Sequence, residues 1–154
     1  MFLLHLLDVV SITLAALVMG VFWGPWLALT RSISTLTPDS FLVVVHRLDK
    51  NLGGIMGVLF PITLLSMISV IILTVGAPAS LILAIVGFAL FVLALIVTVA
   101  VEVPIVKQIR GWTASTMPRD WERLRDRWVS FHLLRVVPGI VGVAALVTGA
   151  LWQH

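Results

Sequence analysis

The fold is decided by residues 51–101, which read NLGGIMGVLFPITLLSMISVIILTVGAPASLILAIVGFALFVLALIVTVAV. This stretch contains no Asp, Glu, Lys, Arg or His, and Gly76-Ala77-Pro78-Ala79 interrupts it near its middle. A membrane-spanning helix needs about 20 predominantly apolar residues. The stretch is therefore long enough for two spans joined by a tight turn, and the chain is predicted to be an integral membrane protein.

Apolar segments on both sides of this hairpin add a first and a fourth span. The whole chain is 60% hydrophobic and 11% charged, whereas a soluble domain carries about 25% charged residues. We therefore predict an all-α membrane protein, residues 1–154, that folds as one four-helix bundle. Its spans are expected at about 3–23, 55–75, 80–101 and 129–152.

Two helical segments are expected outside these spans. Thr37-Pro38-Asp39 has the residues of a helix start. An extra interfacial helix is therefore predicted from Asp39 to about Asn51, lying in the membrane interface or leading into the second span. The fourth helix is predicted to begin near Arg119 and to extend into the cytoplasm, whereas Glu102 is expected to close the third helix, with Pro104 breaking the pattern soon after.

Small residues and prolines predict how the spans pack. Gly53-x-x-x-Gly57 and Ala145-x-x-x-Gly149 are typical of close helix contacts in membranes. Kinks are expected at Pro61 and Pro138. The small-residue patches suit contacts within one bundle and contacts in a homo-oligomer equally well.

The basic residues predict the orientation. All ten lie in or at the edges of two loops, residues 24–54 and 102–128. The positive-inside rule places such loops in the cytoplasm, so both termini are expected outside a bacterial inner (plasma) membrane. This clustering also accounts for the net charge of +3, and the expected partner is the lipid bilayer rather than nucleic acid.

Missing residues exclude several kinds of chemistry. The chain has no Cys and no Tyr, which excludes disulfides, thiolate nucleophiles, Cys-ligated clusters and phenol acids. It also lacks a phosphate-binding loop, a nucleotide fingerprint and the Ser-His-Asp order of a hydrolase. The candidates for chemistry that we consider are its carboxylates, histidines and arginines.

One face of the fourth helix contains arginines and a histidine together with tryptophans and glycines. Spacings of three and four place them on the same side of the helix: Trp121, Arg125, Trp128, His132, Arg135, Gly139 and Gly142. A His and an Arg on the packing side at membrane depth need polar partners there.

Glu102 is the expected partner, because it ends the third span at about the depth where His132 begins the fourth. A carboxylate between His132 and Arg135 can orient the imidazole tautomer. His46 and Arg31 can reach the same level from the first loop. The alternative is that these charges contact lipid headgroups and that Trp128 and His132 anchor the interface, as His5 and Asp8 are expected to do at the other end.

Cofactor binding is a further alternative, although no cofactor is the first expectation. His46, His132 and Glu102 would make a two-His-one-carboxylate set for non-haem iron. His46 and His132 would also serve as two ligands of haem b. The absence of a Glu-x-x-His motif disfavours a dinuclear carboxylate centre.

Three motifs resemble a known family: Glu-Val-Pro-Ile at 102–105, Trp121-x6-Trp128 and His132-x-x-Arg135. They are similar to the motifs of four-span bacterial membrane proteins of unknown function that are grouped with anthrone oxygenases. In that family an Asn-Val-Pro-Leu-Asn-like motif follows the third span and an Asn-His-x-x-Arg-like motif opens the fourth. The present chain has Glu102, Val106 and Phe131 at the three Asn positions.

The resemblance implies cofactor-free addition of oxygen to an activated aromatic carbon. Glu102 or His132 would be the base that forms a carbanion, and Arg135 would stabilise the oxyanion. His46, Trp128 and Arg31 would then contact a lipophilic aromatic or quinone-like substrate at the cytoplasmic membrane boundary.

The same residues are compatible with two other functions. One is a non-catalytic membrane subunit or small-molecule carrier, in which Glu102, His132 and Arg135 form a structural clamp between the third and fourth spans. The other is a membrane electron carrier that binds haem or a metal ion.

Overall fold

The computed structural model describes residues 2–153, and in this part of the chain all regular structure is helical. The elements are α1 (Phe2–Pro25), the π-helical turn η1 (Trp26–Thr30), the 3-10 turn η2 (Ile33–Thr35), α2 (Pro38–Leu73), α3 (Pro78–Val97), the π-helical turn η3 (Thr98–Glu102), α4 (Val103–Arg110) and α5 (Trp121–Leu151). Four helical segments are long and apolar enough to cross a membrane: Phe2–Thr30, Pro38–Leu73, Pro78–Arg110 and Trp121–Leu151. The predicted all-α four-span bundle is confirmed.

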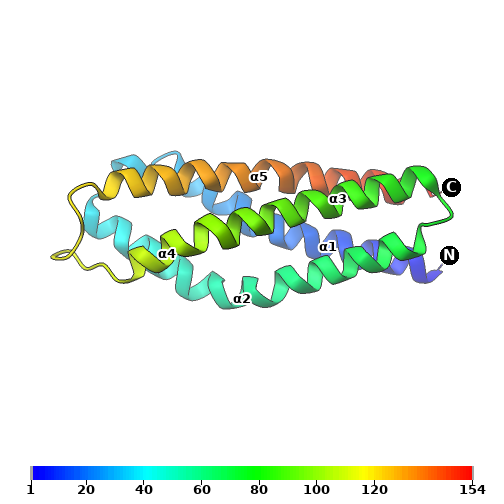
Figure 1. Cartoon of the computed structure of the whole chain (residues 1–154), viewed down its shortest axis with the longest axis horizontal. Helices are drawn as coiled ribbons and strands as arrows, with labels where there is room; N and C mark the ends of the chain where they lie inside the picture. The colour runs from blue at the N-terminus through cyan, green and yellow to red at the C-terminus, as the bar shows by residue number, and fades with distance from the viewer. Residues whose placement is uncertain (1, 154) are drawn as a thin grey trace.

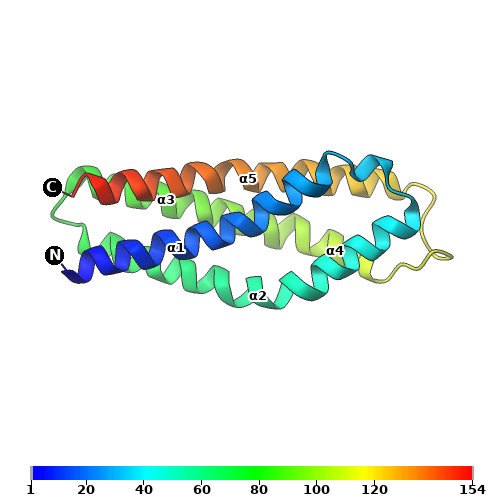
Figure 2. The same cartoon turned by 180° about the vertical axis from the view of Figure 1, so that it is seen from behind.

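The helices form one elongated bundle with both ends of the chain at the same end (Figure 1). Seen from behind, α1 crosses in front of α3 and α5 (Figure 2). The α2–α3 turn lies beside the termini, whereas the η1–η2 connection and the loop after α4 lie at the opposite end. This arrangement places the two charged loops together.

The segment predicted as an interfacial helix is the first part of α2. Thr37 caps the helix by accepting a hydrogen bond from the Ser40 amide, Pro38 occupies the first turn, and the helix continues without interruption to Leu73. Phe41 and Val45 are buried against α4 and α5. The segment therefore leads directly into the second span, which was one of the two expectations, and it is not a separate element.

The third helix does not end at Glu102. It widens into the π-helical turn η3 and continues as α4 to Arg110, so that the residues directly after Glu102 are helical rather than looped. Pro104 lies in the first turn of α4, where its missing N–H is tolerated. The expectation that Glu102 closes the third helix was therefore wrong, although the regular α-helical pattern is interrupted beside Pro104 by the π-helical turn.

Glycines bring α3 and α5 into close contact. A β-carbon built on Gly142 would lie 2.9 Å from the Phe91 ring, and one on Gly149 would lie 3.2 Å from the β-carbon of Leu83. Gly87 of α3 faces the Gly142 carbonyl in the same contact. The small patch predicted at Ala145-x-x-x-Gly149 is thus confirmed as a helix-packing surface.

The other predicted patch has a different environment. A β-carbon on Gly57 would meet no atom within 4 Å, and one on Gly53 would meet only the Asp49 carboxylate of the same helix. The expectation that Gly53-x-x-x-Gly57 packs against another helix of the same bundle was therefore wrong, whereas a contact of this patch in a homo-oligomer stays a prediction. Pro61 cannot donate to the Gly57 carbonyl, and α2 is bent near its middle (Figure 1).

Two apolar clusters fill the bundle. One lies among the four spans and contains Phe22, Phe60 and Phe91. The other lies towards the charged loops and contains Phe41, Ile109 and further residues of α2, α4 and α5. Near the chain termini Asp8 is buried at 6% exposure beside Gln153, which corrects the expectation of an exposed interfacial residue.

Candidate functional site

The site lies where two of the helices change their winding. Pro25 immediately precedes the π-helical turn η1, and Pro104 follows η3 by two residues. π-helical turns widen a helix locally and are frequent at functional sites. The first brings the backbone of α1 close to α5, and the second places Glu102 on the inner side of the third span, where it is buried.

Arg135 connects the polar groups of the site. Its guanidinium Nη2 lies 3.3 Å from a carboxylate oxygen of Glu102 and 2.7 Å from Nδ1 of His132. Nη1 donates a long hydrogen bond of 3.4 Å to the Thr98 hydroxyl. The guanidinium carbon lies 4.6 Å from the centre of the Phe22 ring, within range of a cation–π contact. Residues from α1, η3 and α5 therefore hold one buried positive charge.

His132 is fixed in a single tautomer by its two neighbours. Arg135 can only donate, so Nδ1 accepts; the Phe22 carbonyl can only accept, so Nε2 donates across 2.9 Å. The imidazole is therefore neutral, and both of its nitrogen atoms are engaged. At 1% exposure, with the Trp128 ring 5.7 Å away, His132 positions Arg135 and joins α5 to α1.

Glu102 differs from His132 in having unused hydrogen-bonding capacity. It is 3% exposed, yet neither carboxylate oxygen has a hydrogen-bond partner. The indole N–H of Trp128 lies beside this carboxyl without completing a hydrogen bond to it. A buried carboxylate that is paired with Arg135 but has free lone pairs is available to a reacting molecule.

Glu102 lines a cavity of about 410 Å³ together with Trp128, His132 and Arg135. This volume is within the usual range of small-molecule sites, roughly 300–1,000 Å³. Its walls are mainly apolar and come from α1, α2, the third span and α5, with Phe22, Phe60 and Leu95 among the lining residues. Glu102, Trp128, His132 and Arg135 form its polar wall.

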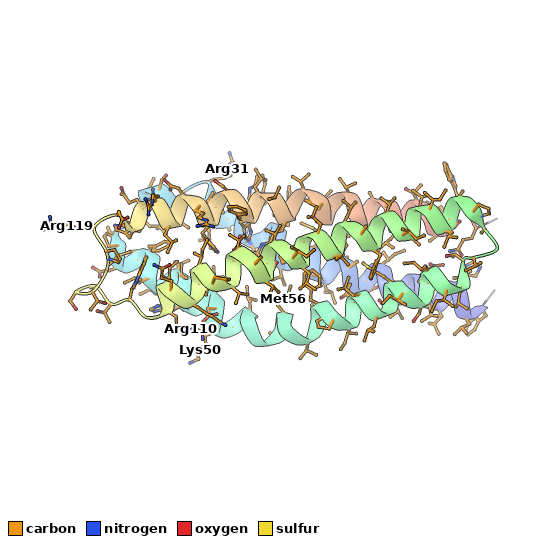
Figure 3. All side chains as sticks on the ribbon, in the orientation of Figure 1. Arg31, Lys50, Met56, Arg110 and Arg119 are labelled. Atoms are coloured by element: carbon orange, nitrogen blue, oxygen red, sulfur yellow. The ribbon has the colours of Figure 1, made fainter. Side chains whose placement is uncertain are left out.

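The structure brings together Glu102, Trp128, His132 and Arg135, but not the two residues expected from the first loop. His46 is bonded through Nε2 to the Ile109 carbonyl at 3.2 Å, where it joins α2 to α4, and it does not line the cavity. Arg31 is exposed and projects away from the bundle (Figure 3).

The three residues predicted as ligands of non-haem iron do not come together in the structure. Among residues 2–153, no group of three or more His, Asp or Glu side chains is arranged to hold a metal ion, so His46, His132 and Glu102 do not form a facial triad. Both ring nitrogens of His132 and Nε2 of His46 are hydrogen-bonded within the protein.

Three groups that the structure places at the site were not predicted from the sequence. The Phe22 carbonyl is a backbone atom without a sequence signal. Thr98 precedes Glu102 by four residues on the third span, and that spacing could have found it. Arg110 of α4 makes a bidentate salt bridge with Asp49 of α2, at 2.8 Å for each bond, and both residues line one end of the cavity.

Comparison with known proteins identifies the family. The family model described as anthrone oxygenase matches residues 47–145, a range that contains Glu102, His132 and Arg135 but not α1. No curated protein and no solved structure matches the chain. Because the match covers more than half of the sequence and the helices have the expected four-span arrangement, the chain belongs to the anthrone oxygenase family.

Proposed function

We propose that this protein is a membrane-embedded oxygenase that needs no cofactor and acts on a lipophilic aromatic substrate of the anthrone type. The observation that carries the proposal is the Glu102 carboxylate, which is buried in an apolar cavity with both oxygens free of hydrogen bonds. Such a group suits a general base for a carbon acid, because no protein donor occupies its lone pairs and the surrounding walls are mainly apolar.

The proposed reaction begins with proton removal. Glu102 takes a proton from the methylene carbon between the two aromatic rings, and the electron pair is delocalised onto the ring carbonyl as an anion. Molecular oxygen takes one electron from this anion, and the two radicals combine in a new C–O bond. Protonation gives a hydroperoxide, which loses water to leave a second carbonyl. The methylene compound and O₂ thus become a quinone and water.

Arg135 is suited to stabilise the anion. Its charge is balanced by Glu102 at 3.3 Å in the resting site, and protonation of Glu102 leaves the guanidinium without that counter-charge. An anionic substrate oxygen would replace it, and a preformed positive charge in a mainly apolar cavity stabilises such an oxygen strongly. His132 keeps the guanidinium in place through the 2.7 Å contact.

We further propose that the site lies at the cytoplasmic end of a bacterial inner-membrane protein with both termini outside. The support is the placement of all ten basic residues in or beside the two loops at one end of the bundle. The cavity lies towards that end, since Asp49, Lys107 and Arg110 are among its lining residues.

The test is Glu102→Gln, measured as anthrone-dependent oxygen uptake by the purified protein in vesicles. The amide has nearly the same shape but is not a base, and we expect the rate to fall by about 10²–10⁴-fold. The matched control is Glu122→Gln, a change at an exposed carboxylate outside the cavity, which should keep the wild-type rate. Wild-type activity in Glu102→Gln would contradict the proposal.

A non-catalytic carrier or membrane subunit is the second candidate. It is supported by His132, whose two nitrogens connect α1 and α5 as a structural clamp would. In that case the wild-type protein takes up no oxygen with anthrone, and His132→Ala lowers the melting temperature while binding of the ring compound falls with it. Measurable wild-type turnover would exclude this candidate.

A further inference from the structure

The cavity reaches the outer surface of α2 at two glycines. Gly53 and Gly57 both line the cavity, and both are exposed on the surface of the bundle. Neither has a positive φ, and a β-carbon on Gly57 would meet no atom within 4 Å. Backbone strain and helix contact therefore do not require glycine at position 57, whereas a larger side chain there would extend into or across the cavity.

The surface around Gly57 is apolar, whereas Gly53 lies beside the Asp49 carboxylate. Ile55 and Val58 of α2 are exposed, as are Val99 and Val103 on the opposite side of the cavity. Val99 and Val103 line the cavity as well, and Met56 projects between α2 and α3 (Figure 3). We use the term lateral opening for the cavity rim formed by Gly53, Gly57, Val99 and Val103. It lies between α2 and the third span, both of which are long and apolar enough to cross a membrane.

Two polar contacts join α2 to α4 at the end of the cavity nearest the charged loops. Asp49 of α2 and Arg110 of α4 form the bidentate salt bridge across it. One turn earlier on α2, His46 is bonded to the Ile109 carbonyl of α4. These bonds hold α2 against α4 at that end of the cavity.

A second observation, at the inner wall of the same cavity, also points to a ligand. Glu102, at 3% exposure, has two oxygens without a hydrogen-bond partner, and Nε of Arg135 also lacks one. A buried carboxylate and guanidinium with unused bonding positions are costly at membrane depth unless a bound molecule meets them.

We propose that the lateral opening admits a flat, apolar aromatic ligand to the cavity directly from the bilayer, and that Gly57 sets the width of this passage. The inference rests on the proposed function for the chemistry at Glu102, but it concerns the route and shape of the ligand. A planar three-ring molecule dissolved in lipid needs no aqueous passage, and the absent side chain at Gly57 leaves a slot beside α2.

The experiment compares two leucine substitutions on the same helix. Gly57→Leu narrows the lateral opening, whereas Gly54→Leu is the matched control, because Gly54 is exposed, has no atom within 4 Å of its β-carbon and does not line the cavity. The full chain is reconstituted in phosphatidylethanolamine–phosphatidylglycerol vesicles. Anthraquinone is the probe, and its binding is followed by quenching of the fluorescence of Trp128, which lines the cavity. A Trp128→Phe protein identifies the signal of that residue.

We expect Gly57→Leu to slow the association of anthraquinone because the passage is narrower. It should also weaken binding about tenfold, because the leucine side chain extends into the cavity and takes space from the ligand. Gly54→Leu should bind as the wild type does. The binding rate should follow the mole fraction of anthraquinone in the bilayer, and Asp49→Asn, which weakens the bridge at the loop end, should not increase it. Equal binding by the two leucine variants, or a faster rate in Asp49→Asn, would overturn the inference.

Anthrone-dependent oxygen uptake separates this inference from the proposed function. Selective loss of binding in Gly57→Leu, in a protein that takes up no oxygen, would support the lateral opening and reject the oxygenase. Oxygen uptake that is unchanged in Gly57→Leu would support the oxygenase and reject the lateral opening.

Discussion

Glycines have opposite roles in the α3–α5 contact and along the middle of α2. Between α3 and α5 the space beside Gly142 and Gly149 is filled by the partner helix, within about the distance that one methyl group would occupy. Beside Gly54 and Gly57 there is no atom within 4 Å. The first pair permits two helices to touch, and Gly57 leaves a cavity open. The same residue type therefore permits close helix packing in one region and lines a cavity in the other.

Among alanine substitutions of these glycines, Gly142→Ala is expected to change the stability of the protein most. The added β-carbon would lie 2.9 Å from the buried Phe91 ring and 3.3 Å from the Gly87 carbonyl, so that α3 and α5 must move apart. We expect the free energy of unfolding to fall by about 2 kcal/mol. Reversible unfolding in mixed detergent micelles measures this change, and an unchanged midpoint would show that the contact is looser than described.

Gly149→Ala should have a smaller effect of the same sign. Its β-carbon would approach the Leu83 β-carbon at 3.2 Å and the Ser80 carbonyl at 3.4 Å, which a small shift of the helix ends can relieve. A loss of about 1 kcal/mol is expected in the same unfolding experiment. A loss larger than that of Gly142→Ala would mean that the end of the contact, rather than its middle, determines its stability.

Gly54→Ala is expected to have the smallest effect and the opposite sign. The helix continues through this residue with no neighbour to obstruct a methyl group. Alanine reduces the freedom of the unfolded chain, so the free energy of unfolding should rise by about 0.5 kcal/mol. Destabilisation instead would reveal a partner on this face of α2, such as a second copy of the chain.

The four spans could be predicted because hydropathy alone reports them. The continuity of α2 could not, since His46, Asp49 and Lys50 interrupt the apolar pattern without interrupting the helix. Their side chains are accommodated at the loop end, where Asp49 meets Arg110 and His46 meets a backbone carbonyl. Polar residues in that position are compatible with an interfacial helix and with an extended span, and only the tertiary contacts distinguish the two.

The Glu102, His132 and Arg135 group was predictable from depth and spacing. The difference in their hydrogen bonding was not, because the sequence left Glu102 and His132 as equal candidates for the base of the proposed reaction. The difference arises because the Phe22 carbonyl accepts a hydrogen bond from the imidazole of His132. The position of a backbone carbonyl cannot be read from a sequence. Likewise, the spacing of Gly53 and Gly57 is the same as that of a helix-packing motif, and sequence does not report what lies opposite a glycine.

The hydrogen bond between the Phe22 carbonyl and His132 also has a consequence for biogenesis. Its partners are 110 residues apart in the chain, one in the first span to be synthesised and the other in the last. At ordinary rates of synthesis, about 5–20 residues per second, several seconds separate their emergence from the ribosome. Until α5 inserts, Glu102 has no counter-charge from Arg135, and the site exists only after the last helix has joined the first.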